Sequence, residues 1–425
     1  MSCAAPRRIC FVFAICIGDS MRKIFISIVA SALLLPSAHA QPAPADLHAL
    51  FNTAWERSVA FQATEGRRLE AAASRIQADS LIAGPPTLGL LHRDDRWTDK
   101  RGLRESEVQL GVPVWMPGQR AARGDLADAQ AAEAEAGGAL ARLNLAAEVR
   151  ERVWQLAAAE AERDVLRHRA EIAASLRDDV RRRVAAGDLA RTDLLLAQQD
   201  HLAAQGLLAD SEGRLVDART RLLQATGVSA LPLRFDEAAA PVSDPAAAAA
   251  AHPRLEAAQR AVQRGERQVG YLRKSRRDPP EVGVLYRNDR AGGGMPSDQT
   301  VGLFIKIPFA TEARNMPRES AAQTDLMTAR AELDRTERVV RSEIDAARQA
   351  LSLAEQQLRL TEERSATLSE RAALLRKAFD AGELGLPEVL RAQNHALEAQ
   401  ADLARQRARR GIAIANLNQA LGVLP

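Results

Sequence analysis

The chain has 425 residues, of which 46% are apolar but only 4% aromatic, and its 58 basic residues stand against 55 acidic ones. Ala, Leu, Glu, Gln and Arg dominate, a composition typical of long helices and not of a large globular core. The excess of positive charge lies within residues 1–40. The remainder is balanced, which argues against nucleic-acid binding, because that function needs a basic face.

The N-terminal segment has the pattern of an export signal. Met21-Arg22-Lys23 precedes an apolar run from Ile24 to Leu35, and Ala38-His39-Ala40 then forms a small-residue cleavage site. We therefore expect residues 1–40 to be a signal peptide that starts at Met21, with residues 1–20 as an extension. A membrane anchor is the alternative, but the apolar run is too short to cross a bilayer. All three cysteines lie in this segment, so the mature chain would have no disulfide.

The first half of the chain predicts a helix, two strands and a very long helix. A helical pattern runs from about Asp46 to Ala83 and stops at Gly84-Pro85-Pro86. Thr87 to Arg93 then has strand character, and Ser106 to Trp115 alternates apolar and polar residues with a period of two. The long helix is expected from Pro117 to Ala185. The apolar face of the second strand carries Val108, Leu110, Val112 and Val114.

The second half predicts the same order of elements. A helix is expected over residues 253–277 and a strand from Glu281 to Arg287. A Gly-rich loop, Asn288 to Gln299, separates this strand from a second one, Val301 to Phe309. The second long helix is expected from Pro317 to Ala381. The apolar faces of these two strands carry Val282, Val284, Leu303, Ile305 and Ile307.

The second long helix carries a coiled-coil seam. From Val340 to Phe379, apolar or small residues recur at alternating spacings of four and three. A helix of this length reaches roughly 100 Å and needs partners along it, because helix propensity alone does not stabilise it. Ala-rich sequence makes heptads easy to find, but the unbroken alternation favours the coiled coil.

Each long helix ends in a turn that recurs 195 positions later. Ala186-Gly187-Asp188-Leu189 corresponds to Ala381-Gly382-Glu383-Leu384, and the match continues without a gap to Gly227 and Gly422. Glycine supplies the left-handed conformation that ends a helix. Chance similarity between Ala-rich helices does not explain this register. A period of this length indicates duplication of half a domain.

The duplication divides the mature chain into residues 41–228, an Ala/Pro linker at 229–251, and residues 252–425. Four strands cannot close a barrel, and an open sheet in lipid leaves its edges unpaired. Three chains would supply twelve strands. The predicted fold is therefore mainly α with membrane β, a trimer forming a 12-stranded β-barrel that continues into a long α-helical coiled-coil barrel.

The chain resembles the TolC-like outer-membrane efflux factors over essentially its whole mature length. The duplicated order of elements, the turn motif Ala-Gly-[Asp/Glu]-Leu-x5-[Leu/Val]-Leu-x-Ala-Gln and the closing Leu-Gly-Val carry the resemblance. It is nearer the CzcC-like branch, which works with cation and heavy-metal pumps, than TolC itself. The resemblance implies a homotrimeric duct in the outer-membrane lipid of a Gram-negative bacterium, with a long periplasmic helical part. A periplasmic adaptor and an inner-membrane RND-type pump would be its partners.

The resemblance also implies where the duct would work. It places the adaptor contacts at the two turns, Ala186 to Leu189 and Ala381 to Leu384, and a periplasmic gate at Glu388, Arg391 and Asp193. Three copies of Glu388 would form a carboxylate ring that attracts cations, and Arg391, which departs from the family's second acidic position, would pair with it. The alternative is that Glu388 and Asp193 are helix N-terminal acids favoured by the helix dipole.

Two other classes of function are weighed against the duct. A periplasmic coiled-coil adaptor or scaffold shares the export signal and the long helices, but it predicts one helical hairpin and not duplicated strand pairs. An enzyme has no nucleophile motif, phosphate loop or metal-ligand spacing behind it. We therefore predict no catalytic residue, no metal site and no cofactor. The exported substrate stays open between divalent heavy-metal cations and organic compounds.

Overall fold

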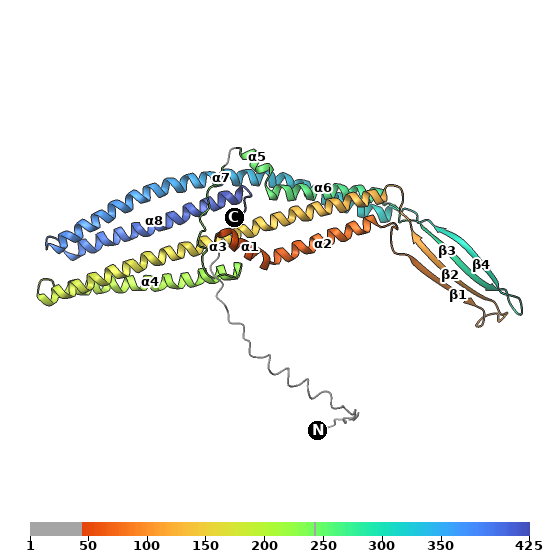
Figure 1. Ribbon diagram of the computed structural model, residues 1–425, viewed down its shortest axis with the longest axis horizontal. Helices are drawn as coiled ribbons and strands as arrows, with labels where there is room; N and C mark the ends of the chain where they lie inside the picture. Colours follow the sequence, from red (N-terminus) through yellow and green to blue (C-terminus); the bar gives the residue numbers. More distant parts are fainter. Residues whose placement is uncertain (1–44, 242–243) are drawn as a thin grey trace, which may run out of the picture. The chain divides into compact units, whose positions relative to one another are not determined.

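The computed structural model describes residues 45–241 and 244–425, which belong to one structural unit. The predicted signal peptide, residues 1–40, lies outside the described residues. The first half forms α1 (Leu47–Arg57), α2 (Val59–Asp79), β1 (Thr87–Asp94), β2 (Arg104–Pro113), α3 (Gln119–Ala186) and α4 (Arg191–Thr226) (Figure 1). The second half forms α5 (Pro245–Ala250), α6 (Pro253–Lys274), β3 (Glu281–Arg290), β4 (Asp298–Lys306), α7 (Glu312–Asp380) and α8 (Leu386–Ala420).

The duplication is visible in the backbone as well as in the sequence. The first expected helix is broken at Ser58, whose hydroxyl oxygen accepts a hydrogen bond from the N–H of Phe61 at 3.0 Å and so caps α2. In the second half, 194 positions later, Nδ1 of His252 accepts from the N–H of Arg254 at 3.1 Å and caps α6. The prediction of one continuous helix from Asp46 to Ala83 was therefore wrong.

Two further boundaries differ from the sequence predictions. α7 begins at Glu312 and not at Pro317, because the carbonyl of Thr311 accepts hydrogen bonds from the backbone of Arg314 and Asn315. Pro317 therefore lies inside the helix, where it removes a backbone donor. The loop between the last two strands is shorter than expected, since β3 extends to Arg290.

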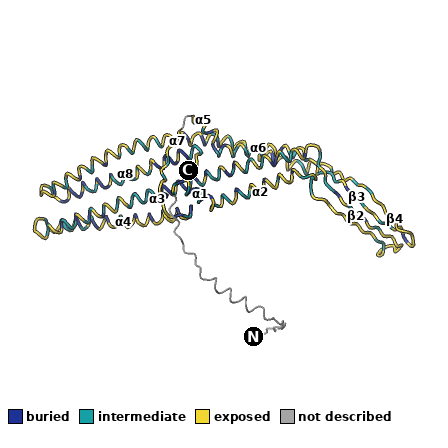
Figure 2. The backbone as a smooth tube through the Cα atoms, viewed as in Figure 1, coloured by how far each residue is buried: buried dark blue, intermediate teal, exposed yellow. Residues whose placement is uncertain are grey.

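The helices lie side by side in a layer. Towards the ends of the long helices, α4 packs on α3, α3 on α8, and α8 on α7, so that α4 and α7 are the outer helices of four (Figure 1). Towards the strands, the order of contacts is α2, α3, α6 and α7. The predicted seam of α7 is confirmed, because each seam position from Val340 to Phe379 is buried or half-buried, whereas most positions between them are exposed (Figure 2).

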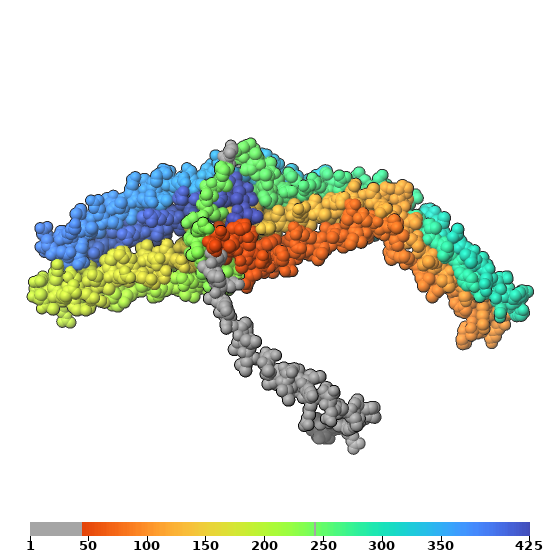
Figure 3. Space-filling model, in the orientation of Figure 1, coloured from red at the N-terminus to blue at the C-terminus, as the bar shows by residue number. Residues whose placement is uncertain are grey.

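The linker crosses the helical layer halfway along its length (Figure 3). Its Glu237 forms a bidentate ion pair with Arg150 of α3, at 2.6 and 2.8 Å, and the two side chains are only 13% and 3% exposed. The linker backbone also binds α8, because the carbonyl of Ala238 and the N–H of Ala240 both bond the amide of Asn418. The linker therefore joins a helix of the first half to a helix of the second.

The strands form one antiparallel sheet in the order β1-β2-β3-β4. Residues that are partners across neighbouring strands share a face. The register therefore assigns each side chain of the sheet to one of its two faces. Seven of the nine predicted barrel residues lie on one face. The remaining two, Val114 and Ile307, lie one residue beyond the ends of β2 and β4. The apolar face consists of three rows: Leu88, Leu110, Val284 and Leu303; Leu90, Val108, Tyr286 and Val301; and Val112, Val282 and Ile305.

Candidate functional site

The two predicted turns have the same backbone structure. Gly187 and Gly382 have φ values of 90° and 79°, in the left-handed region. The N–H of Asp188 donates to the carbonyl of Arg183, and the N–H of Glu383 donates to that of Ala378, both at 2.9 Å. This six-to-one hydrogen bond is the Schellman closure of a helix end. The repeat in the sequence thus encodes one turn twice.

Both turns expose the same positions. In each, the Ala, Gly and acidic residue are exposed, whereas Leu189 and Leu384 are half-buried. The two leucines pack against one hydrophobic cluster drawn from all four helices, and this cluster holds the two turns together. Its buried members are Leu176, Val180, Ala197, Phe379, Leu386, Val389 and Leu390.

Charged side chains surround this cluster one turn before the helix ends. Arg376 of α7 forms ion pairs with Asp179 of α3 and with Asp380, each at 3.1 Å. From the other side, Arg183 of α3 donates to the carbonyls of Phe379 and Asp380 at 3.1 and 3.3 Å. This contact between the two helix ends was not predicted from the sequence. The only available signal was the presence of arginines and aspartates just before both glycines.

The three predicted gate residues differ in their surroundings. The carboxylate of Asp193 accepts a hydrogen bond from the N–H of Ala190 at 3.2 Å and is half-buried, so it caps α4. Glu388 and Arg391 are exposed, and within residues 45–241 and 244–425 neither takes part in an ion pair. Asp193 therefore contacts the backbone at the start of its helix, as expected for a helix N-terminal acid, while Glu388 and Arg391 face outward.

The polar face of the sheet carries a row of ion pairs across β1, β2 and β3. Arg287 of β3 pairs with Glu105 and Glu107 of β2 at 3.2 and 3.0 Å. Glu105 is also 3.5 Å from Arg93 of β1. On the same face, Lys306 pairs with Glu281 at 3.5 Å. The sheet thus presents apolar side chains on one side and paired charges on the other.

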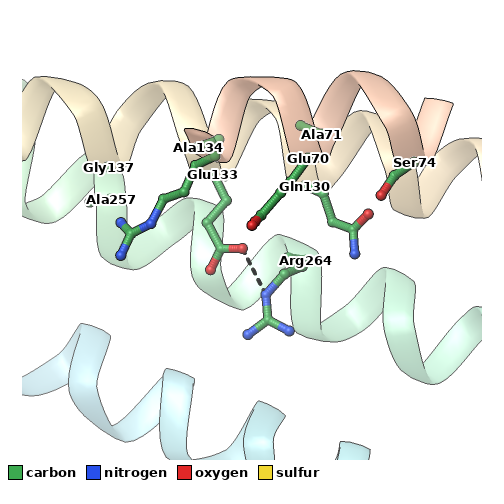
Figure 4. A pocket seen from close by; sticks show the side chains of 10 residues that line it. Glu70, Ala71, Ser74, Gln130, Glu133, Ala134, Gly137, Ala257 and Arg264 are labelled. Carbon is green, nitrogen blue, oxygen red and sulfur yellow. Dashed lines mark ion pairs between the residues drawn. The ribbon is translucent and has the colours of Figure 1, made fainter. Parts of the chain in front are cut away.

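A hollow between α2, α3 and α6 contains polar side chains but no catalytic arrangement. Figure 4 shows the ion pair between Glu133 and Arg264, at 2.8 Å, with Glu70, Gln130 and Ser74 around it. No histidine lines this hollow to activate the serine. In the part of the chain that the structure describes, no three potential metal ligands gather into a site.

Among the described residues, no helix combines the length and hydrophobicity needed to cross a membrane.

Comparisons with known proteins agree on the architecture. Residues 59–228 match the family model described as outer membrane efflux protein. No curated protein matches the sequence. The outer membrane protein VceC of Vibrio cholerae is similar over 89% of this chain and 96% of its own, with 17% identity and a TM-score of 0.70. The MtrE outer membrane channel of Neisseria gonorrhoeae is similar over 90% of each chain, with 15% identity and a TM-score of 0.72.

A crystal structure of CusC, which is described in terms of transmembrane channel formation, is also similar. The similarity covers 89% of this chain and 92% of the CusC chain, with 14% identity and a TM-score of 0.73. At such identities the similarity shows the fold. The mainly helical, duplicated architecture with its antiparallel sheet is therefore the architecture of solved outer-membrane channels.

Proposed function

We propose that this chain is the outer-membrane duct of a tripartite efflux system, acting as a homotrimer and not as an enzyme. The observation that carries the proposal is the sheet, which has three rows of apolar residues on one face and a row of ion pairs on the other. Its edge strands, β1 and β4, each have one neighbour. Three copies would join these edges, turn the apolar face to lipid and enclose the charges around water.

The helical layer supports the same arrangement. Four helices lie side by side both near the sheet and towards the turns, and α3 and α7 run through both parts (Figure 1), so three copies would extend the barrel as a helical tube through the periplasm. Trp97, in the β1–β2 loop, is 94% exposed, and Phe309, just after β4, is 81% exposed. They lie towards opposite ends of the sheet, where aromatic side chains suit the two membrane interfaces.

The turns would form the periplasmic end of the duct. We assign adaptor contact to the exposed residues of both turns, because they project beyond the cluster that holds the helices together. We assign the gate to Glu388 and Arg391, which have no ion-pair partner within the described chain and so are available to a neighbouring copy. Asp193 would position α4, since its carboxylate is engaged by the backbone.

Purified protein tests the duct directly. The expected result is a trimer that stays with outer membranes after a salt wash and forms channels in planar bilayers. Glu388→Gln combined with Arg391→Ala should change the conductance. A protein that washes off as a monomer without channel activity would favour a periplasmic scaffold. Normal channels with unchanged conductance in the double variant would remove the gate assignment alone.

The cargo is tested in cells. The resemblance to the CzcC-like branch makes divalent heavy-metal cations the first cargo to examine, with an RND-type pump and a periplasmic adaptor as partners. Deleting the gene and its neighbouring pump gene separately should give matching sensitivity to zinc, cobalt, cadmium or copper ions. Matching sensitivity to dyes or antibiotics would support the duct but identify organic compounds, and not metal ions, as its substrates.

A further inference from the structure

The outer face of α4 carries an apolar stripe that is left uncovered by residues 45–241 and 244–425. Leu195, Leu202, Ala209, Val216 and Leu223 follow one another at intervals of seven, and all five are exposed. The positions between them, Gln199, Gly206, Gly213 and Thr220, complete the four-three alternation of a coiled-coil seam and are exposed as well. This stripe differs from the buried positions of α4, which face α3.

The outer face of α7 carries a second stripe with the same four-three spacing, in which Gln and Glu residues alternate with apolar residues and one Thr. Its members are again all exposed, although the helix already has a buried seam with α8. α4 and α7 are the outer helices of the four-helix layer, so the two stripes lie on its two opposite edges (Figure 1). The stripe of α7 consists of Ala346, Gln349, Leu353, Gln356, Leu360, Glu363, Thr367, Glu370 and Leu374.

The two stripes match residue by residue when they are measured from the two turns. Leu195 lies 8 positions after Gly187, and Leu374 lies 8 positions before Gly382. The other eight positions of each stripe lie 12, 15, 19, 22, 26, 29, 33 and 36 residues from the turn glycine next to that helix. Because α4 runs away from its turn and α7 runs towards its own, equal distances place the paired positions at equal heights.

Side-chain sizes are complementary at five of the nine positions of this register. Leu202 falls opposite Thr367, Ala209 opposite Leu360, and Leu223 opposite Ala346. Gly206 and Gly213, beside which an added Cβ would meet no atom within 4 Å, fall opposite Glu363 and Gln356. Small residues facing large ones allow two helices to approach closely.

Charge also fits the register. Glu212 lies 25 positions after Gly187 and Arg359 lies 23 positions before Gly382, and both flank the same side of the two facing stripes. Both border their stripes and are exposed, and in the described part of the chain neither forms an ion pair.

The stripes are also placed as a ring requires. At about 100° per residue, each is centred roughly 150° around its helix from the buried seam, which is the angle between neighbours in a ring of twelve helices.

We infer that the α4 stripe of one copy packs antiparallel against the α7 stripe of the next copy, in the register that places Ala209 opposite Leu360. This inference rests on the proposed trimer and adds the surface and register through which its helical part closes. Such a contact is heterologous, since different faces meet, and it closes a ring when the rotation allows.

Cysteine cross-linking tests the register, because the chain has no cysteine after Cys16. The variant carries Ala209→Cys and Leu360→Cys in every copy. Within one chain these positions lie on opposite edges of the layer, so a disulfide forms only between copies. Oxidation in outer membranes should yield a covalent trimer on a non-reducing gel. The matched control, Ala209→Cys with Leu353→Cys, moves one partner by about 10 Å along the same stripe, beyond disulfide reach, and should lose the trimer band.

The outcomes separate the register from the duct. A native trimer with channel activity but no cross-link would overturn the register and leave the duct intact. Stronger cross-linking in the control pair would also overturn it. Absence of both trimer and channels would remove the proposed function. A charge exchange gives a test without cysteine: Glu212→Arg should lower the temperature at which the trimer dissociates, and adding Arg359→Glu should restore it.

Discussion

Arg183 of α3 and Phe379 of α7 join the two helix ends. The guanidinium carbon of Arg183 lies 4.8 Å from the centre of the Phe379 ring, and its Nη1 donates to the carbonyl of the same residue at 3.1 Å. Phe379 is 1% exposed. A side chain from one half of the chain thus caps the last turn of the long helix of the other half.

Removal of this contact should loosen the second turn. Arg183→Ala deletes a charged hydrogen bond and a cation–π contact, which together are worth about 2–3 kcal/mol. We expect the amide of Glu383 to exchange its hydrogen about 10- to 100-fold faster, measured by mass spectrometry on the intact protein. Arg182→Ala is the matched control, because the contact of Arg182 with Asp179 lies within α3. Equal exchange rates of the Glu383 amide in both variants would show that the contact of Arg183 does not stabilise the second turn.

A side chain at either turn glycine should destabilise the protein, although space is available. A Cβ at Gly187 or Gly382 would meet no atom within 4 Å, so the cost is that of left-handed backbone, about 1–2 kcal/mol. Gly187→Ala and Gly382→Ala should therefore each lower the urea midpoint. Gly270→Ala, inside α6 and equally uncrowded, should raise it, because alanine favours a helix interior. If all three variants shifted the urea midpoint in the same direction, the left-handed backbone conformation would not be the cause of the effect at Gly187 and Gly382.

The linker should depend on its buried ion pair. Arg150→Met leaves the carboxylate of Glu237 buried without its partner, which typically costs about 3–5 kcal/mol. Arg150→Met with Glu237→Gln should recover most of the loss, because no uncompensated charge remains. Thermal unfolding of both variants measures this. The exposed pair Arg335–Glu332 provides the control, and Arg335→Met should change stability by less than about 1 kcal/mol.

His252 should make stability depend on pH. Burial lowers the pKa of His252 below its usual 6.5, and nearby Arg254 lowers it further, while Glu343 acts in the opposite direction. The unfolded chain therefore binds a proton at a higher pH than the folded protein, so stability falls as the pH drops below about 6.5. Protonation would also remove the acceptor that caps α6.

Substitution by asparagine isolates this contribution. His252→Asn keeps a capping acceptor but does not titrate. The difference in melting temperature between the variant and the original protein should therefore shift in favour of the variant between pH 7.5 and pH 5.5. Parallel pH profiles for the two proteins would show that His252 is not responsible.

Much of the candidate site was predictable from local sequence. The position of both turns followed from Gly187 and Gly382, since only glycine adopts that conformation at low cost. The gate residues were harder to separate. Asp193 and Glu388 occupy equivalent sequence positions, yet only Asp193 bonds a backbone N–H in the described structure. Such a hydrogen bond depends on the conformation of the preceding loop, and sequence periodicity does not report it.

The sequence by itself determined the elements, their duplication and the seam of α7, because helix and strand periodicity and turn chemistry act over a few residues. Only the tertiary structure decided which helices lie at the edges of the layer, which face of the sheet collects the charges, and that Arg183 meets Phe379 across 196 positions of chain. Those relationships join distant segments through packing, and a pattern along one helix carries no information about the neighbour that it will contact.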